Sequence, residues 1–378
     1  MSETKKILPE LRFPEFKNKG EWEKDMVDNL VSTITPPKKI TSSNYQKYGK
    51  FPIIDQSKNY YCGWTNDNEA VITEDLPLII FGDHTCVIKI AKKPFAQGAD
   101  GIKILKTKDK IFPEYLFHYL CHNEVVMEDY KRHYSILKDK VIVFPNINSG
   151  EQQKIASCLS SLDEVIEAHS KKLELLKDHK KGLMQNLFPQ DGEKVPKLRF
   201  KEFENSEEWE TKKIEDVLDY ERPEDYIVSD IGYQEVGIPV LTANKSFILG
   251  YTQEDFGIYK KLPAIIFDDF TVDTKYVDFP FKVKSSAIKI LTPKKKDNLK
   301  FIYELLSQIK FDAKEHKRYY ISEYQKTEIL FPTIQEQQKI ASCLSSLDEL
   351  IAAQEEKIEQ LKLHKKGLMQ GLFPKISD

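Results

Sequence analysis

The chain has 378 residues, of which 40% are hydrophobic and 31% are charged, and its formal net charge at pH 7 is −3. This length suits two or three domains, and no stretch approaches the roughly 18 apolar residues that a membrane span requires. A protein that held DNA alone by neutralising phosphates would usually be basic, so either the chain binds no nucleic acid, or it reads bases locally while partners supply the electrostatic attraction.

The cysteines and the first residues indicate a compartment. None of the five cysteines forms a CxxC pair, and the start MSETKKILPE lacks the apolar core of a signal peptide. Reduced thiols of this kind are typical of a cytoplasm rather than of a disulfide framework. We therefore expect a cytoplasmic protein.

The sequence contains an internal duplication. The run EQQKIASCLSSLDE stands at 151–164 and returns unchanged at 336–349, an offset of 185 residues. Upstream, LPELRFPEFKNKGEW at 8–22 corresponds to VPKLRFKEFENSEEW at 195–209, an offset of 187 residues. Because this period far exceeds that of a solenoid repeat, we expect two domains of one fold carried on two equivalent connectors.

The repeat predicts seven segments in chain order. They are an N-terminal arm (1–22), a first variable domain (23–147), a first helical connector (148–189), a linker with the repeated arm (190–209), a second variable domain (210–332), a second helical connector (333–374) and a tail (375–378).

Each variable domain is predicted to be mixed α/β (α+β). β-Branched runs indicate strands, and apolar periodicity after Pro113 and near Phe301 indicates one helix in each copy. The expected strands are 87–90, 102–105, 264–267 and 287–291.

Polar and aromatic residues alternate at one turn of each variable domain, where 56–61 (QSKNYY) matches 243–248 (ANKSFI). Such side chains carry the donors and acceptors that base edges require. The alternative is a solvated hairpin loop with a core aromatic. The candidate base-contacting residues of these turns are Gln56, Ser57, Lys58, Asn59, Trp64, Asn244, Lys245, Ser246 and Tyr251.

Repeated arginines give a second set of candidates. Arg132 in KRHY and Arg318 in KRYY stand just before the last strand of each domain, together with Tyr134 and Tyr320. Arginine can bind guanine or phosphate with two parallel hydrogen bonds, although a structural ion pair is the alternative. For the other repeated pair, Arg12 and Arg199 in the apolar LRF arms, the structural interpretation is favoured.

The connectors are predicted to be long helices. Apolar residues recur at alternating spacings of four and three over 155–187 and 340–372, which is a heptad seam. Asn148 and Thr333 precede Glu151 and Glu336 by three residues, as in a capping box, and both helices are expected to stop at a Phe-Pro pair.

Neither helix can bury its apolar seam by itself, so each must pack against another helix. The second copy of the helix is the obvious partner. With antiparallel pairing over the full length, Lys180 lies opposite Leu347 and Lys365 lies opposite Leu162. The alternative is two core helices of one large globular domain. The narrow seam and the charged outer faces favour a coiled coil.

Motifs that carry chemistry are missing from the sequence. It contains neither GxxxxGK[ST] nor GxGxxG. His118 and His122 flank Cys121, but a third ligand is missing and the second copy has no histidines there, so we expect no metal site. Asp83 and His84 could pair as acid and base, but the second copy has Phe270 in place of the histidine.

Two variable domains on two near-identical long helices resemble the specificity subunits of type I restriction–modification systems. The EQQKIA start of each helix, the LSSLDE run and the HKKGLMQ.LFP end look like the conserved regions of that family. The LRFPEF arm is similar to its N-terminal segment. The resemblance covers essentially the whole chain, and it is looser within the variable domains.

The resemblance implies a non-catalytic subunit with two target-recognition domains, each reading one half of an asymmetric, interrupted DNA site. It implies two methyltransferase (modification) subunits that bind S-adenosylmethionine and methylate adenine, and restriction/motor subunits that use ATP and Mg and cut unmethylated DNA. This chain would bind no cofactor itself. Double-stranded DNA and these subunits are therefore the expected partners, with no membrane.

Partner docking is assigned to the ends of the two helices, because their apolar residues do not all fit a two-helix seam. The expected docking residues are Met184, Phe188, Met369 and Phe373. Three alternative functions stay open: a stand-alone sequence-specific DNA-binding regulator, an enzyme with two catalytic lobes, and a subunit that serves a fused methylase–nuclease.

Overall fold

The computed structural model describes residues 7–99, 101–127, 131–243, 246–313 and 317–374. The chain forms two compact units. Unit 1 contains the described residues up to Lys171 and those from Glu356 onward, and unit 2 runs from Lys172 to Glu355. Each unit therefore combines one variable domain with part of each long helix. The predicted segment boundaries stay predictions.

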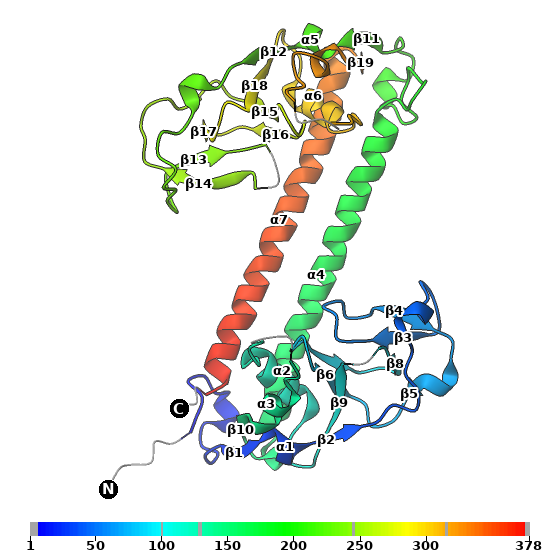
Figure 1. Ribbon diagram of the computed structural model, residues 1–378, viewed down its shortest axis with the longest axis vertical. Coiled ribbons are helices and arrows are strands. Elements are labelled where there is room, and N and C mark those ends of the chain that lie inside the picture. Colours follow the sequence, from blue (N-terminus) through cyan, green and yellow to red (C-terminus); the bar gives the residue numbers. More distant parts are fainter. Residues whose placement is uncertain (1–6, 100, 128–130, 244–245, 314–316, 375–378) are drawn as a thin grey trace. The chain divides into compact units, whose positions relative to one another are not determined.

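Unit 1 is a mixed α/β structure (Figure 1). One antiparallel sheet has the strand order β2-β9-β6-β7. A second, mixed sheet has the order β4-β3-β8-β5, in which β3 and β8 are parallel. Strand β1 pairs with β10. The elements are β1 Glu23–Met26, α1 Val27–Leu30, β2 Val31–Ile34, β3 Phe51–Ile54, β4 Gly63–Thr65, β5 Val71–Ile72, β6 Leu78–Gly82, β7 Ile88–Ala91, β8 Phe95–Gln97, β9 Ile102–Thr107, α2 Pro113–His122, α3 Tyr134–Asp139 and β10 Val141–Phe144.

Unit 2 repeats this order, except that its described residues contain no counterpart of β5 or α3. Its sheets are β12-β18-β15-β16, β14-β13-β17 and β11-β19. The register repeats as well, because Ile79 faces Leu105 in unit 1 and Ile265 faces Leu291 in unit 2. The elements are β11 Glu210–Lys213, α5 Ile214–Val217, β12 Leu218–Glu221, β13 Ile238–Leu241, β14 Ile248–Thr252, β15 Ala264–Asp268, β16 Thr274–Val277, β17 Lys282–Val283, β18 Ile288–Pro293, α6 Leu299–Leu306 and β19 Glu328–Phe331.

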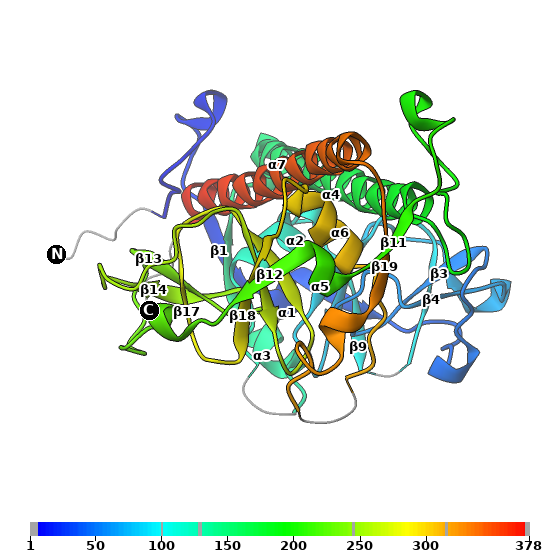
Figure 2. The same ribbon diagram turned by 90° about the horizontal axis from the view of Figure 1, so that it is seen from above.

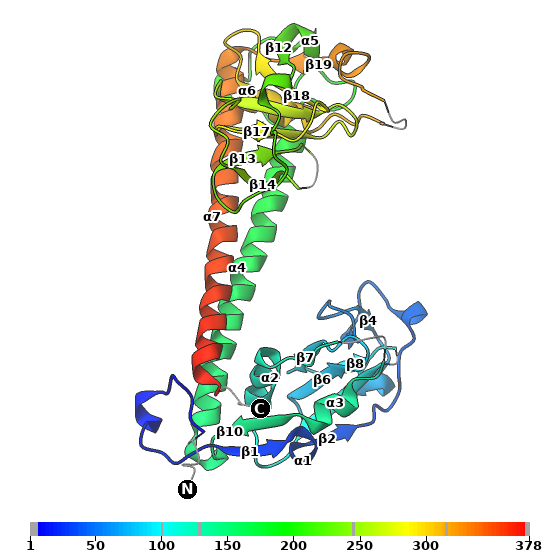
Figure 3. The same ribbon diagram turned by 60° about the vertical axis from the view of Figure 1, so that its left-hand side comes forward.

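The core of each unit lies between its sheets and the long helices. In unit 1, α2 packs between α4 (Glu151–Leu187) and strands β6 and β7 (Figure 3). Strand β6 is buried along its whole length, as a central strand covered on both faces should be. The α/β character predicted from the sequence is confirmed, and so are the two helices expected after Pro113 and near Phe301.

The two long helices, α4 and α7 (Ile334–Leu372), pair antiparallel within each unit. In unit 2, Lys177 binds Glu355 and Lys180 binds Asp348, both at 2.6 Å, so the numbering falls along α7 as it rises along α4. Lys180 was predicted to face Leu347, one residue away. In unit 1, Lys365 binds Asp163, next to the predicted Leu162. The predicted antiparallel pairing is confirmed, and the partners of Lys180 and Lys365 each lie one residue from the predicted position.

The repeated arms form the same hook in each unit, blue in unit 1 and green in unit 2 (Figure 2). Each hook contains one short 3-10 helix, which is Pro14–Phe16 in unit 1 and Lys201–Phe203 in unit 2. Arg12 in the first arm binds Glu151, and Arg199 in the second binds Glu336. Both carboxylates therefore bind arm arginines, which confirms the structural role of Arg12 and Arg199.

Half of the predicted capping box is present in unit 2, where the backbone N–H of Glu336 donates to the Thr333 hydroxyl at 3.5 Å. In unit 1 the backbone N–H of Glu151 donates instead to the Ser149 hydroxyl at 3.2 Å, which corrects the box predicted at Asn148.

No helix within the described residues combines the length and apolar character needed to cross a bilayer.

Candidate nucleic-acid interface

Three segments of unit 1 meet at the turn between β6 and β7. The backbone N–H of Asp83 donates to the carbonyl of Gly101, at 2.7 Å, just before β9. The Asp83 carboxylate accepts the backbone N–H of Tyr134 at 2.9 Å. The backbone carbonyl of Asp83 accepts the backbone N–H of His133. We call the β6–β7 turn, Gly101 and segment 131–134 the convergent edge of unit 1.

Arg132 lies exposed on this edge. The neighbouring Lys131 carbonyl is 3.1 Å from Nδ1 of His84 in the β6–β7 turn, so segment 131–134 is fixed on both sides of the arginine. Tyr134 is half-buried, with the Lys103 ammonium 5.4 Å from the centre of its ring. The edge therefore presents a guanidinium on an ordered backbone.

The loop between β3 and β4 packs against the same turn. Thr85 donates its hydroxyl to the carbonyl of Gln56 at 2.7 Å. Gly101 has a φ of +97°, a backbone conformation that favours glycine, and a Cβ at this position would lie 2.6 Å from the nitrogen of the flexible Gln56 side chain. The Gln56 amide consequently covers Gly101.

The predicted residues of this loop separate into two groups. Ser57 is half-buried, and its backbone N–H donates to Asp55 at 2.8 Å. Lys58 and Asn59 are exposed at the loop tip. Trp64 is half-buried on β4, with its ring 5.8 Å from that of Tyr61. Lys58 and Asn59 are thus the predicted loop residues that a base or phosphate can reach most directly.

A buried lysine holds this loop in place. Lys89 on β7 is 4% exposed, and its ammonium donates to the carbonyls of Asp55 at 2.7 Å and Asn59 at 2.6 Å. Burial lowers the pKa of Lys89, against the attraction of the Asp55 carboxylate. One ammonium therefore closes the two ends of the loop that carries Gln56 and Lys58. The sequence analysis missed Lys89, because a lysine on a strand ordinarily points to solvent.

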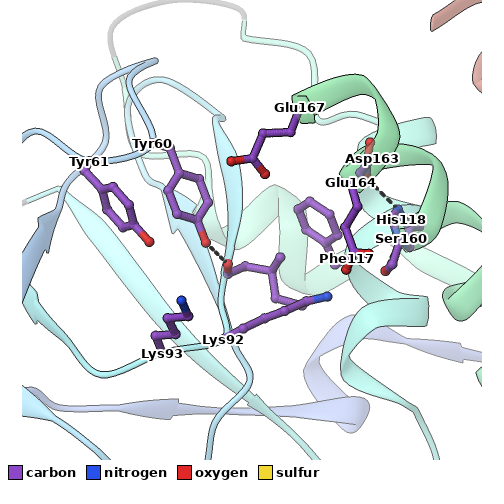
Figure 4. A pocket seen from close by; sticks show the side chains of 11 residues that line it. Tyr60, Tyr61, Lys92, Lys93, Phe117, His118, Ser160, Asp163, Glu164 and Glu167 are labelled. Carbon is purple, nitrogen blue, oxygen red and sulfur yellow. Dashed lines mark hydrogen bonds and ion pairs between the residues drawn. The ribbon is translucent and has the colours of Figure 1, made fainter. Parts of the chain in front are cut away.

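The far end of the loop borders a cavity of about 760 Å³ beside α4 (Figure 4). Tyr60 donates its hydroxyl to the carbonyl of Ile90. Tyr60, Tyr61, Lys92 and Lys93 line one side, and Asp163, Glu164 and Glu167 of α4 line the other. A basic and aromatic wall of the variable domain thus lies opposite an acidic wall of the helix.

The same edge is present in unit 2. Asp269 donates its backbone N–H to Ala287 at 2.8 Å, and its carboxylate accepts the backbone N–H of Tyr320 at 2.8 Å. Lys289 pairs with the same carboxylate at 3.2 Å. Arg318 is exposed, donates to the Ser286 hydroxyl at 3.3 Å and lies over the Phe270 ring. The convergent edge of unit 2 therefore consists of the β15–β16 turn, Ala287 and segment 317–320.

The other predicted contacts of unit 2 have mixed outcomes. Ser246 is exposed and Tyr251 is half-buried on β14, whereas Asn244 and Lys245 lie outside the described residues. Tyr320 is 1% exposed, with its ring centre 5.1 Å from that of Phe267. This burial corrects the expectation that the Tyr320 side chain contacts DNA; its backbone holds the edge instead.

The predicted docking residues belong to the cores. Phe188 stacks on Phe301 at 5.5 Å, and Phe373 contacts the ring of Tyr115 at 5.6 Å. Phe188 and Phe373 are 2% and 1% exposed, Met369 is 7% exposed, and Met184 is half-buried against the core of unit 2. The docking hypothesis is therefore wrong for Phe188, Met369 and Phe373, because their apolar surface is already covered.

A charged cluster fixes each variable domain to the long helices. In unit 2, Glu304 of α6 is 2% exposed and binds both Lys180 of α4, at 3.1 Å, and Lys300, at 2.9 Å. Asp348 of α7 binds the same two lysines. Paired charges of this kind are tolerated in a core only while both signs are present, so the cluster ties α6 to both helices.

Unit 1 has a different cluster at the same place. His118 occupies the position of Glu304, with Nε2 3.0 Å from the Ser160 hydroxyl and Nδ1 3.9 Å from Asp163. Burial, with help from the charges of Lys365 and Lys92, lowers the pKa of His118 to about 3. The imidazole is therefore neutral near pH 7, and its contact with Asp163 is not an ion pair. Among the described residues, no group of three His, Cys, Asp or Glu side chains could hold a metal ion.

Comparison with known proteins identifies the family. The family model for the type I restriction modification DNA specificity domain matches residues 20–178 and again 206–363, which is most of the chain. Two such domains on paired long helices define a DNA specificity subunit. The chain belongs to the family of type I restriction–modification specificity subunits.

Individual relatives agree with this assignment. Over 162 residues the chain is 41% identical to the type I restriction enzyme EcoR124I/EcoR124II specificity subunit of Escherichia coli, and the match covers 40% of either protein. It is 24% identical to the type I restriction enzyme MjaVIII specificity subunit of Methanocaldococcus jannaschii, over 96% of this chain and 93% of that one. The fold is similar to that of the type I restriction–modification S subunit from M. genitalium, with a TM-score of 0.74 at 16% identity, covering 98% of this chain and 100% of that one.

Proposed function

We propose that each unit reads one half of an asymmetric, interrupted DNA site through its convergent edge. The observation that carries this proposal is the repetition of the edge: Asp83 and Asp269 hold the same backbone segment in the two units, and that segment exposes Arg132 in one and Arg318 in the other. A guanidinium on an ordered backbone can donate two hydrogen bonds to guanine in the major groove.

The neighbouring loops complete the contact. In unit 1 the exposed tip, Lys58 and Asn59, supplies donors and an acceptor beside Arg132, and the Lys89 ammonium limits its movement. In unit 2 Ser246 is exposed in the corresponding loop. An ordered loop loses less conformational entropy on binding than a free one. Differences between the two loops would give the two halves of the site different sequences.

The chain acts in this proposal as a non-catalytic guide in the cytoplasm. It positions two methyltransferase subunits for adenine methylation and restriction/motor subunits for cleavage of unmethylated DNA. S-adenosylmethionine, ATP and Mg belong to those partners, and this chain binds none of them. Its net charge of −3 supports the division of labour, because partners would then supply most of the phosphate contacts.

Exchange of residues 23–147 for the first variable domain of another family member tests the proposal. Methylated adenines are mapped in DNA from cells that carry the parent or the exchanged chain with its modification subunits. We expect one half of the methylated site to change and the other half to stay the same. Changes in both halves would refute separate reading, and tight specific binding by the chain alone would favour a stand-alone regulator.

A further inference from the structure

A lysine-rich loop lies next to the convergent edge of unit 1. Tyr45 donates its hydroxyl to the Asp55 carboxylate at 3.3 Å and accepts the backbone N–H of Ala99 at 2.9 Å. Asp55 directly precedes Gln56, so this hydroxyl ties the loop to the segment that packs on the edge. We call residues 38–50 the flanking loop of unit 1.

Unit 2 has a flanking loop of the same construction at residues 226–237. Gln46 pairs with Trp64 in unit 1, and Gln234 pairs with Tyr251 in unit 2, both as antiparallel bridges. The β4 and β14 strands that carry these partners are equivalent. Gln46 and Gln234 are therefore equivalent positions, and so are the next residues, Lys47 in unit 1 and Glu235 in unit 2.

The two flanking loops carry opposite charge. The loop of unit 1 contains four lysines and no acidic residue, whereas that of unit 2 contains Asp230 and Glu235 and no basic residue. The local charge is thus +4 in one copy and −2 in the other, within a chain of net charge −3. A shared fold does not require this difference, since the same backbone accommodates both sequences.

Two of the four lysines are available to a ligand. Lys38 binds Asp67 at 2.6 Å, whereas Lys47 and Lys50 are exposed and have no acidic partner among the residues that the structure describes. The Lys50 ammonium donates one long hydrogen bond, of 3.5 Å, to the side-chain oxygen of Asn68. Their ammonium groups lie 5.5 Å and 4.9 Å from the ring centres of Tyr48 and Phe51. Tyr48, between them in sequence, is 76% exposed.

We infer that Lys47 and Lys50 bind the phosphate backbone of double-stranded DNA beside the bases that unit 1 reads, and that the acidic loop of unit 2 makes no such contact. This inference rests on the proposed function. Phosphate contacts position a protein on the duplex without reading sequence. The flanking loops therefore contribute unevenly to the charge-dependent part of DNA binding, through Lys47 and Lys50 in unit 1 and through no lysine in the loop of unit 2.

The salt dependence of binding measures this contact. Each phosphate contact contributes about −0.9 to the slope of log K against log salt concentration. The double variant Lys47→Gln/Lys50→Gln, in the full chain assembled with its modification subunits, should therefore lower the magnitude of the slope by roughly 1.8. Because phosphate contacts carry no sequence information, the affinity should fall by the same factor for a duplex with the mapped methylation site and for an unrelated duplex.

A matched pair of lysines in the same unit provides the control. Lys92 and Lys93 are exposed, line the cavity beside α4 and carry the same charge (Figure 4). Lys92→Gln/Lys93→Gln should leave the slope unchanged. An unchanged slope in the Lys47/Lys50 variant, or an equal loss in the control, would overturn the inference.

A substitution in unit 2 tests the asymmetry. Glu235→Lys places a cation at the position equivalent to Lys47, and we expect it to increase the magnitude of the slope by about 0.9. Failure of the parent complex to prefer its own site would count against the proposed function. If the parent complex prefers its own site but the substitutions at Lys47, Lys50 and Glu235 leave the salt slope unchanged, the inference about the flanking loops is wrong and the proposed function is unaffected.

Discussion

Arg12 binds the Glu151 carboxylate through two parallel hydrogen bonds of 2.7 Å, although the two residues lie 139 positions apart. The guanidinium also donates to the carbonyl of Lys19 at 3.0 Å. Glu151 begins α4 and is 1% exposed. The pair therefore joins the N-terminal arm to the first turn of the long helix, and Arg199 and Glu336 repeat it at 2.8 Å.

Replacement of Arg12 by alanine should destabilise unit 1. It leaves the buried Glu151 carboxylate without its partner, and such a loss costs about 3–5 kcal/mol. Urea unfolding followed by tryptophan fluorescence measures the change. Arg132→Ala makes the same exchange at an exposed arginine and should leave stability nearly unchanged. A loss below about 1 kcal/mol for Arg12→Ala, as for a surface ion pair, would contradict the assigned role.

Arg132→Ala and Arg318→Ala should each weaken recognition of one half-site. If the guanidinium makes a bidentate base contact, the loss of binding free energy is about 1–3 kcal/mol. The measurement is competition binding of the assembled complex with duplexes in which one half-site at a time is altered. Equal weakening on every duplex would indicate phosphate contacts, and the base-reading role of these arginines would then be wrong.

Lys89→Met should loosen the loop that carries Lys58 and Asn59. The substitution removes the donor to two carbonyls, and hydrogen bonds from a charged group stabilise by roughly 1.5–3 kcal/mol. We expect discrimination at the half-site read by unit 1 to fall at least about 10-fold, with the other half-site unaffected.

Two variants control for a general loss of structure at Lys89. Lys275→Met changes the half-buried counterpart on β16, and its effect should spare the half-site read by unit 1. Lys89→Arg retains a cation and should recover part of the discrimination. Unchanged half-site discrimination in Lys89→Met would show that this ammonium does not position the loop.

His118 should make unit 1 less stable in mild acid. Its pKa is about 3 in the folded chain, against 6.5 for an unperturbed histidine, so between these values the unfolded chain binds a proton that the folded chain does not. Stability then falls as the pH drops below about 6.5, by up to about 1.4 kcal/mol per pH unit. Urea unfolding of the parent and of His118→Gln at pH 7 and pH 5 measures this dependence. The parent should lose more stability than the variant, and His179→Gln, at an exposed position, should behave like the parent; equal pH dependence of all three proteins would contradict the assignment.

Much of the fold could be predicted from the sequence, because it is encoded by local periodicity. The strand expected at 102–105 is β9, Ile102–Thr107, and the heptad seam predicted the partners of Lys180 and Lys365 to within one residue. The exact repeat made the antiparallel partner easy to identify. Both features need only residues close in sequence or an identical second copy.

Contacts between distant segments could not be read in the same way. Phe188 looked like a docking residue because the helix seam ends at Leu187, but Phe301, more than 100 positions later in the sequence, covers it. Lys89 resembled a solvated strand residue, and only the folded chain brings Asp55 and Asn59 to its ammonium. The KRYY motif places Arg318 correctly outside, whereas the Tyr320 ring is buried against that of Phe267, more than 50 positions earlier in the sequence.

Unit 1 is assembled from two separate stretches of the chain, whereas unit 2 is continuous. Met369, Leu372 and Phe373 belong to the same core as Tyr115 and Leu159. During synthesis the ribosome completes every residue of unit 2 before it makes these three. The domain that is translated first therefore finishes folding last, and until residue 373 emerges its apolar surface around Tyr115 stays open to solvent and to chaperones.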